Sequence, residues 1–311
     1  MPIRIVVAHP EPESSGHWVA ALRTRLPDAE VFAWRPGAAA VADYAVGWQP
    51  PGDFFARQPQ LRAFFSAAAG VDHLLRHPGL PATLPLIRLE DAGMAAQMAE
   101  YCLNEIVGLH RRRDEYAAQQ RAASWRELPV EPREAWPIGV FGLGVLGTPV
   151  AQAIAAYGFP VRGYSQRGRA IDRVACFDAS HGLREFLSGC RVLILMAPLT
   201  PATADLFDPE RLGWLPAGAW LINVARGGLL VESALLDAID RGRLAGATLD
   251  VFRDEPLPPA HPFWHHPKIR ITPHVAAVTR IEESADQVVA KLRAIERGAT
   301  VGGIVDRRRG Y

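Results

Sequence analysis

The chain has 311 residues, enough for two domains that each bury a core of their own. Hydrophobic residues make up 49% and charged residues 22% of the sequence, proportions that are ordinary for a soluble globular protein. The net charge is +1, so no overall field attracts nucleic acid or an anionic membrane, and neither is expected as a partner.

The N-terminus and the cysteines together predict a cytoplasmic protein. Residues 1–8 read as a short strand and lack the charged and apolar regions of a signal peptide. No apolar run is long enough to cross a bilayer. Cys102, Cys176 and Cys190 form no CxxC pair and have no histidine at ligand spacing, so we expect reduced thiols.

The first third of the chain alternates strand and helix patterns, which favours a parallel sheet. A helix is predicted over 14–26, with Ser14 or Ser15 as its N-cap. Strands are predicted at 3–8, 30–34, 44–48, 63–66 and 85–89.

One long helix is predicted next, over 95–121. Met98, Cys102, Ile106 and Leu109 recur at the spacing of a single buried helix face. The three arginines 111–113 are interpreted as its solvated side or as the rim of a dimer interface, rather than as a nucleic-acid patch.

From Ile138 the alternation of strands and helices becomes regular, which predicts an α/β fold with two Rossmann-like domains. Strands are predicted at 138–141, 161–164, 192–196, 220–224, 247–251 and 269–272, and helices at 146–157, 232–240 and 281–297. The last helix is expected to return to the first domain. Residues 1–98 plus 282–311 then form a substrate domain and 99–281 a dinucleotide-binding domain, with a cleft between them for the ligand.

A glycine turn, Gly142-Leu-Gly-Val-Leu-Gly147, stands between a predicted strand and a predicted helix. In that context Gly142 permits the tight turn and Gly144 lets the backbone approach a pyrophosphate. Gly147 allows the helix to pack closely on the strand, and the amides at the helix N-terminus face the anion. The pattern predicts a dinucleotide site.

The strand after this turn predicts which dinucleotide is bound. An NAD site usually offers an acidic residue there for the ribose hydroxyls, whereas this chain has Ser165 followed by Arg167 and Arg169. An acidic side chain repels a 2′-phosphate, and serine with arginine accepts one. NADP(H) is therefore the preferred cofactor, with NAD(H) as the alternative. The competing interpretation is that these arginines bind no cofactor and are simply solvated.

Arg226, Glu255 and His274 each stand just past a run that predicts a buried strand. Reduction of a 2-oxo acid requires an anchored carboxylate, a polarised carbonyl and a delivered proton. The planar fork of Arg226 can bind carboxylate and carbonyl oxygens, and His274 can donate the proton. Glu255 can orient His274 and favour its protonated form. Asp250, at a strand end, is a candidate to bind the nicotinamide amide.

The motifs around these residues resemble the signatures of the D-isomer-specific 2-hydroxyacid dehydrogenase family. They are Asn223-Val-Ala-Arg-Gly-Gly228, Asp250-Val-Phe-Arg-Asp-Glu-Pro-Leu-Pro258 and Thr272-Pro-His-Val-Ala-Ala277. Four further segments, 42–48, 69–73, 88–94 and 305–311, are similar to the glyoxylate/hydroxypyruvate reductase A subgroup. The resemblance covers nearly the whole chain.

The resemblance implies catalysis by Arg226, Glu255 and His274. It also implies a flavodoxin-like substrate domain, a Rossmann-like cofactor domain and a homodimer joined through the cofactor domains. The backbone of Gly70 and Val71 is expected to hold the substrate carboxylate, and Trp48 to border a small pocket. The remaining cofactor contacts expected of such an enzyme are Val145, Leu146, Pro198, Thr203, Val224 and Ala225. Alanines at 67–69 replace an expected glycine, which leaves the carboxylate loop geometry open.

The function predicted is NAD(P)H-dependent reduction of small 2-oxo acids, with glyoxylate and hydroxypyruvate as substrates. One alternative is a dinucleotide-sensing binding protein like the C-terminal-binding corepressors, which share the same catalytic set. Another is a different member of the family, such as a phosphoglycerate dehydrogenase. No metal is expected, because Pro262 and Pro267 break helical geometry around His261, His265 and His266.

Overall fold

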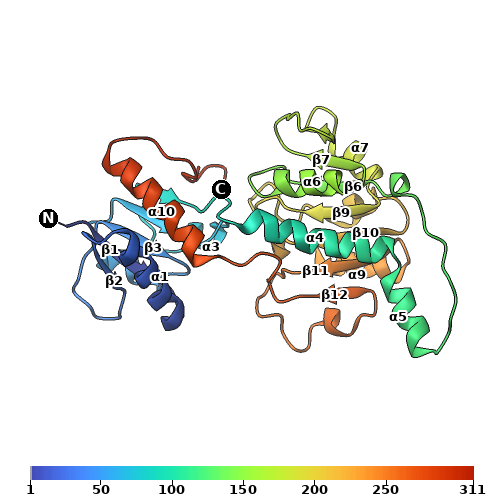
Figure 1. The fold of residues 1–311 in the computed structure, drawn as a ribbon, viewed down its shortest axis with the longest axis horizontal. Helices are drawn as coiled ribbons and strands as arrows, with labels where there is room; N and C mark the ends of the chain where they lie inside the picture. Colours follow the sequence, from blue (N-terminus) through green and yellow to red (C-terminus); the bar gives the residue numbers. More distant parts are fainter. Residues whose placement is uncertain (1) are drawn as a thin grey trace. The chain divides into compact units, whose positions relative to one another are not determined.

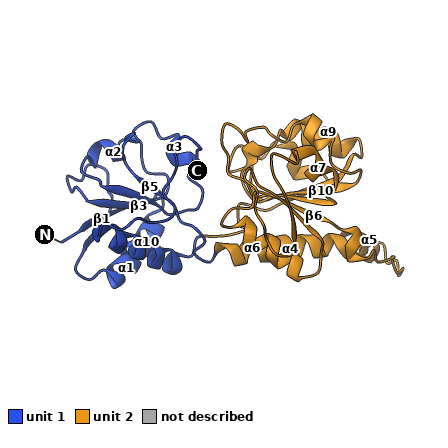
Figure 2. Ribbon diagram, turned by 90° about the horizontal axis from the view of Figure 1, so that it is seen from above, with its two compact units in different colours: residues 1–93, 279–311 blue, residues 94–278 orange. Residues whose placement is uncertain are grey.

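A computed structural model describes residues 2–311, which divide into two compact units (Figure 2). Unit 1 comprises Met1–Gly93 and Thr279–Tyr311, and unit 2 comprises Met94–Val278. Both boundaries fall a few residues before the predicted ones at 98/99 and 281/282. The first boundary lies earlier because helix α4 (Met94–His110) belongs to unit 2 as a whole. Its apolar face from Met98 onward is part of the core of unit 2.

Unit 1 is built on a five-stranded parallel sheet in the order β2-β1-β3-β4-β5. This is the 2-1-3-4-5 order of flavodoxin-like folds. The strands are β1 (Arg4–Ala8), β2 (Glu30–Ala33), β3 (Tyr44–Gly47), β4 (Ala63–Ser66) and β5 (Leu86–Ile87). The helices are α1 (Pro12–Arg25), α2 (Phe54–Arg57), α3 (Asp72–Leu75) and α10 (Ile281–Glu296). Helices α1 and α10 cover one face of the sheet, and α2 and α3 the other (Figure 2).

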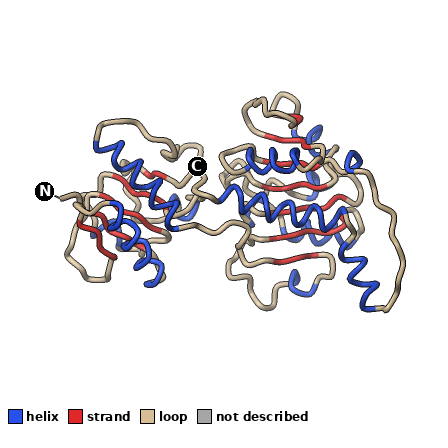
Figure 3. The backbone as a smooth tube through the Cα atoms, viewed as in Figure 1, coloured by secondary structure: helices blue, strands red, loops and turns tan. Residues whose placement is uncertain are grey.

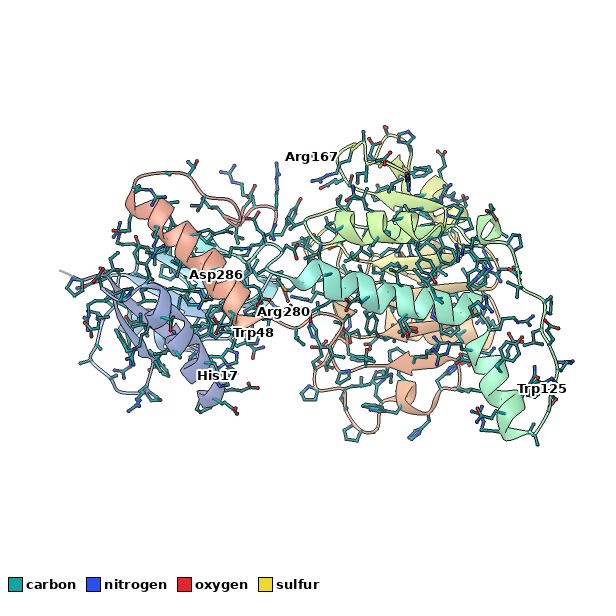
Figure 4. All side chains as sticks on the ribbon, viewed as in Figure 1. His17, Trp48, Trp125, Arg167, Arg280 and Asp286 are labelled. Atoms are coloured by element: carbon teal, nitrogen blue, oxygen red, sulfur yellow. The ribbon has the colours of Figure 1, made fainter. Side chains whose placement is uncertain are left out.

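The C-terminal helix is attached to unit 1 through helix α1. The guanidinium of Arg25 lies 2.6 Å from the carboxylate of Asp286, which Figure 4 labels on α10. Helix α1 begins two residues earlier than predicted because Pro12 occupies its first turn, where proline needs no amide hydrogen. The predicted serine N-cap is therefore wrong: Glu11 holds that position, and Ser14 lies inside the helix.

Unit 2 contains a seven-stranded parallel sheet in the order β12-β11-β10-β9-β6-β7-β8. From β8 to β11 this is the 3-2-1-4-5-6 order of the Rossmann fold, so the predicted fold class is confirmed. The strands are β6 (Ile138–Phe141), β7 (Val161–Tyr164), β8 (Val174–Phe177), β9 (Val192–Leu195), β10 (Ala219–Asn223), β11 (Leu244–Leu249) and β12 (Ile269–Ile271). Its other elements are α5 (Arg113–Arg121), η1 (Arg133–Ala135), α6 (Gly147–Ala156), α7 (Leu183–Ser188), α8 (Pro209–Leu212), η2 (Gly227–Leu229), α9 (Glu232–Asp240) and η3 (Pro262–His265).

Helices cover both faces of this sheet, as Figures 1 and 2 show. Helices α4 and α6 pack on one face with Cys102, Ile106 and Ile154 in the core. Helices α7 and α9 pack on the other with Phe186 and Leu235. Because the central strands are covered on both sides, β6, β9 and β10 are buried along their whole length.

The predicted long helix is two helices. Helix α4 ends at His110, and Arg112 adopts a left-handed backbone conformation with φ of 56° before α5 begins. Helix α5 buries no side chain within this chain, so no core face continues from α4 into it. Figure 3 shows α5 and the loop after it extending away from the rest of unit 2. Among residues 2–311, no helix is long and apolar enough to cross a membrane.

Candidate functional site

The glycine turn lies at the carboxyl end of β6, where its neighbours in the sheet are β7 on one side and β9 on the other. Gly142 has φ of 113°, and a Cβ atom there would lie 2.5 Å from the backbone nitrogen of Ala197. A Cβ atom on Gly147 would lie 1.9 Å from the carbonyl oxygen of Gly142. These two glycines therefore permit the tight turn and the close packing that the sequence predicted.

Gly144 differs from these two, because no atom lies within 4 Å of the position a Cβ would take. A side chain here would occupy only open space beside the backbone, in front of the N-terminus of α6. Val145 is exposed and Leu146 half-buried at the same turn. The turn therefore offers backbone amides and an unobstructed approach to a phosphate group, which fits a dinucleotide.

The other predicted cofactor residues follow β9 and β10, the next strands of the sheet. In the loop after β9, the hydroxyl of Thr203 donates to the carbonyl oxygen of Pro198 at 2.7 Å, which closes the loop on itself. Val224 is buried directly after β10, and the amide of Ala225 donates to the side chain of Asn223 at 3.1 Å. All of these residues lie at the carboxyl edge of the sheet, where open α/β sheets bind ligands.

The residues predicted to select the cofactor form a short loop after β7. The hydroxyl of Ser165 donates to the carbonyl oxygen of Arg167 at 2.5 Å, while the side chain of Arg167 is exposed (Figure 4). A Cβ on Gly168 would lie 2.7 Å from a carboxylate oxygen of Asp178, a residue that sequence reasoning missed. Hydrogen bonds from Ser180 and His181 lower the pKa of Asp178 to about 2.

Arg226, Glu255 and His274 follow β10, β11 and β12, three adjacent parallel strands. Their side chains therefore belong to one edge of the sheet. Nδ1 of His274 lies 2.8 Å from Oε2 of Glu255, and the other carboxylate oxygen accepts the amide of Phe252 at 2.9 Å. Since Nδ1 is engaged, Nε2 is the nitrogen that can carry a proton to a substrate.

Glu255 is held as a carboxylate by these contacts. Partial burial alone raises the pKa of Glu255, but the hydrogen bonds from His274 and the Phe252 amide outweigh it. The positive charges of His274 and Arg226 act in the same direction, so the pKa of Glu255 lies below its ordinary value.

Glycine brings the Arg226 loop close to the Glu255 loop. A Cβ on Gly227 would lie 1.9 Å from the carbonyl carbon of Phe252, so only glycine permits the two backbones to meet. Asn223 fixes the other side of this loop by donating to the carbonyl oxygen of Arg226 at 3.0 Å. The guanidinium of Arg226 donates to the carbonyl oxygen of Ala225 at 2.7 Å.

Asp250 holds the loop that carries His274. Its side chain is 1% exposed, and its carboxylate accepts the amides of Val275 at 2.8 Å and Ala276 at 2.9 Å. It also accepts the hydroxyl of Thr272 at 2.6 Å. The sequence identified Asp250 but not this task, and its predicted contact with the nicotinamide amide stays a prediction.

The predicted substrate-binding residues outside this edge all belong to unit 1. Trp48 follows β3, and its ring centroid lies 3.8 Å from that of His73 (Figure 4 labels Trp48). Gly70 and Val71 lie between β4 and α3, with Val71 buried. Trp48 thus lies beside the first turn of α3, and this turn begins directly after Gly70 and Val71.

The histidines near η3 make contacts with single carboxylates. His261 lies 3.5 Å from Glu232, and His266 lies 3.2 Å from Asp240. Within residues 2–311, no group of three or more histidine, cysteine, aspartate or glutamate side chains is arranged to hold a metal ion.

Comparison with known proteins places this geometry in a family. Residues 103–276 match the model of the D-isomer specific 2-hydroxyacid dehydrogenase NAD binding domain. The chain is 45% identical to glyoxylate/hydroxypyruvate reductase A of Serratia proteamaculans, over 99% of this chain and 100% of that protein. Two crystal structures have TM-scores of 0.94.

The first of these structures is a D-isomer specific 2-hydroxyacid dehydrogenase of Xanthobacter autotrophicus in complex with NADPH and MES, 37% identical with 100% of both chains covered. The second is an NADPH-dependent glyoxylate/hydroxypyruvate reductase of Sinorhizobium meliloti in complex with NADP and sulfate, 34% identical with 99% of this chain and 100% of that chain covered. The resemblance predicted from the motifs is confirmed: the chain belongs to the D-isomer specific 2-hydroxyacid dehydrogenase family.

Proposed function

We propose that this protein reduces small 2-oxo acids, with glyoxylate and hydroxypyruvate as substrates, to the corresponding 2-hydroxy acids using NADPH. The observation that carries the proposal is the 2.8 Å contact between His274 and Glu255, on the sheet edge that also bears the glycine turn. The names of the relatives in Serratia and Sinorhizobium support the same substrates. The products are glycolate and D-glycerate.

Each residue of the catalytic set has a separate task in the proposed reaction. When bound, the reduced nicotinamide supplies a hydride to the carbonyl carbon. His274 delivers a proton from Nε2 to the carbonyl oxygen, so that the carbonyl becomes a hydroxyl. Glu255 keeps the ring oriented, and Arg226 binds the carboxylate and the carbonyl oxygen.

The cofactor preference follows from the loop after β7. Ser165 and Arg167 offer a hydroxyl and a cation where an NAD site offers a carboxylate. The relatives from Xanthobacter and Sinorhizobium were crystallised with NADPH and NADP, which supports the same preference here. On the substrate side, we assign Trp48 to the wall of the pocket and the backbone of Gly70 and Val71 to the substrate carboxylate.

We also propose a homodimer and a cytoplasmic location. Helix α5 buries nothing within its own chain, and Trp125 in the loop after it is fully exposed (Figure 4). An apolar side chain in this position is suited to burial against a second copy. All three cysteines are free thiols, as expected in a reducing compartment.

A substrate panel tests the proposed function. Glyoxylate, hydroxypyruvate, pyruvate and bulkier 2-oxo acids are each assayed with NADPH and with NADH. We expect the highest kcat/KM for the two small substrates with NADPH, and a lower NADPH preference in Arg167→Ala. Equal kcat/KM with the two cofactors would contradict the assigned preference. Inactivity on every substrate, together with tight NADPH binding, would favour a dinucleotide-sensing protein.

A further inference from the structure

A line of three hydrogen-bonded side chains connects helix α4 to the loop that carries His274. The phenol oxygen of Tyr101 lies 2.6 Å from the hydroxyl oxygen of Thr272. That hydroxyl in turn lies 2.6 Å from Oδ1 of Asp250. Tyr101 comes from the second turn of α4, whereas Thr272 and Asp250 follow β12 and β11.

The direction of each hydrogen bond in this line is fixed by chemistry. An ionised Asp250 carboxylate can only accept, so Thr272 donates its single hydroxyl hydrogen to it. Thr272 then has only acceptor capacity left, so Tyr101 must donate. Burial, followed by the nearby charges of Asp250 and Glu105, raises the pKa of Tyr101, and the phenol therefore keeps its proton at neutral pH.

The far end of the line is the backbone on either side of His274. His274 has φ of 57°, a left-handed conformation that is uncommon for a residue other than glycine. Its amide donates to the carbonyl oxygen of Asp250 at 2.8 Å, and the next two amides donate to the Asp250 carboxylate. Because these contacts hold the strained residue, the position of the Asp250 carboxylate determines where the imidazole lies.

We propose that Tyr101 and Thr272 are positioning residues for His274, acting through the carboxylate of Asp250. The inference rests on the proposed function, in which His274 is the acid. Without the two hydroxyls the Asp250 carboxylate loses its one side-chain donor among three hydrogen-bond donors, and with it a fixed orientation. The loop relaxes, and the 2.8 Å contact between His274 and Glu255 lengthens.

If Tyr101 only anchored helix α4, its loss would lower Tm without lowering kcat. Helix α4 has a second anchor one turn further on, where Glu105 accepts the hydroxyl of Thr248 at 2.9 Å and a guanidinium nitrogen of Arg270 at 2.6 Å. Thr248 is buried in β11 and bonds to α4, but it is not part of the line to Asp250. Thr248→Val is therefore a matched control for Thr272→Val.

The test compares Tyr101→Phe, Thr272→Val and the double variant with Thr248→Val. Tyr101→Phe removes one hydrogen bond of the line and Thr272→Val removes both, and each single change is expected to lower kcat with glyoxylate by about three- to tenfold. The KM for NADPH should change less than kcat, because the glycine turn that approaches the pyrophosphate follows a different strand. The double variant should be no slower than Thr272→Val alone, since both changes break the same line. Thr272→Ser keeps the hydroxyl and should retain kcat.

The comparison of kcat with Tm separates positioning from stability. A longer contact with Glu255 leaves the imidazole of His274 less well oriented, so kcat should fall in Tyr101→Phe. Thr248→Val should lower Tm with kcat unchanged. If Tyr101→Phe lowered only Tm, or if the two changes were additive in kcat, the proposal would be wrong.

A measurement on the ligand-free protein distinguishes this proposal from the proposed function. The ring resonances of His274 are compared by NMR in the wild type and in Tyr101→Phe. We expect them to shift in the variant, because the 2.8 Å contact with Glu255 lengthens, whether or not the protein reduces any 2-oxo acid. Identical ring resonances would overturn the positioning role, while an inactive wild type would count against the proposed function alone.

Discussion

At the residue scale, Arg226 and His274 have different tasks, and their kinetic effects should separate accordingly. Arg226→Ala removes the fork that binds the substrate carboxylate, so the KM for glyoxylate should rise more than kcat falls. His274→Ala removes the proton donor, so kcat should fall by about 10²–10⁴-fold with NADPH binding retained. Steady-state kinetics and NADPH titration measure both effects. Near-normal kcat in His274→Ala would show that another group is the acid.

Glu255→Gln should lower kcat and change the pH dependence of stability. Without the carboxylate the imidazole of His274 loses its partner at 2.8 Å, so its orientation for proton transfer is lost and kcat should fall. The pKa of Glu255 is lowered in the folded state, so its stabilising contribution is present above the unfolded pKa and lost as pH falls through the folded one. Thermal melts from neutral pH to about pH 3 should therefore show a smaller decrease of Tm in the variant than in the wild type. This pH range brackets the usual pKa of a glutamate. Parallel melting curves would contradict this.

The sequence identified the side chains of the candidate site better than it identified what holds them. Arg226, Glu255 and His274 stand in recognisable motifs, each just past an apolar run. Tyr101 carries no such signal in the sequence. Its hydrogen-bond partner Thr272 is 171 residues away, and the apolar pattern of its helix places Tyr101 outside the predicted buried face. Contacts of this kind depend on the tertiary structure, which spacing along the chain does not show.

At the element scale, Gly144 and Gly147 of the turn after β6 should respond differently when a methyl group is added. Gly147→Ala places Cβ 1.9 Å from a backbone oxygen and should lower Tm strongly. Gly144→Ala meets no atom within 4 Å and should leave Tm nearly unchanged, but it should weaken NADPH binding because the methyl lies where the phosphates approach. Tm and NADPH fluorescence titration measure the two effects. Unchanged NADPH affinity in Gly144→Ala would contradict the assigned binding turn.

The elements were predicted where apolar pattern and burial agree. Strands β6, β9 and β10 are continuous apolar runs buried on both faces, and the sequence identified all three. Strand β8 was missed because it lies at the sheet edge and buries only its first residue, Val174. The break between α4 and α5 was missed because it depends on one left-handed residue, Arg112, for which arginine gives no signal.

At the scale of the whole molecule, the alternation of strands and helices predicted both parallel sheets. The strand orders, 2-1-3-4-5 in unit 1 and 3-2-1-4-5-6 in unit 2, follow the general rules for crossover connections. The sequence predicted a helix from residue 95 but could not assign residues 94–98 to unit 2, because that depends on the packing of α4 against α6, which lies far along the chain.

The proposed dimer is testable through the exposed tryptophan after α5. Trp125→Ala should shift the protein from dimer to monomer in size-exclusion chromatography with light scattering, because a large apolar contact is lost. Trp264, exposed on η3, provides the matched control, and Trp264→Ala should stay dimeric. A wild-type protein that is monomeric at micromolar concentration would refute the dimer directly.

In the proposed reaction, a hydride passes from the nicotinamide to the carbonyl carbon of a small 2-oxo acid. NADPH carrying deuterium at the transferable C4 position is incubated with the protein and glyoxylate or hydroxypyruvate, and the product is analysed by mass spectrometry and NMR. We expect one deuterium at C2 of glycolate or D-glycerate, formed in step with NADPH oxidation and lost in His274→Ala. A product without deuterium at C2, or no product from either substrate, would contradict it.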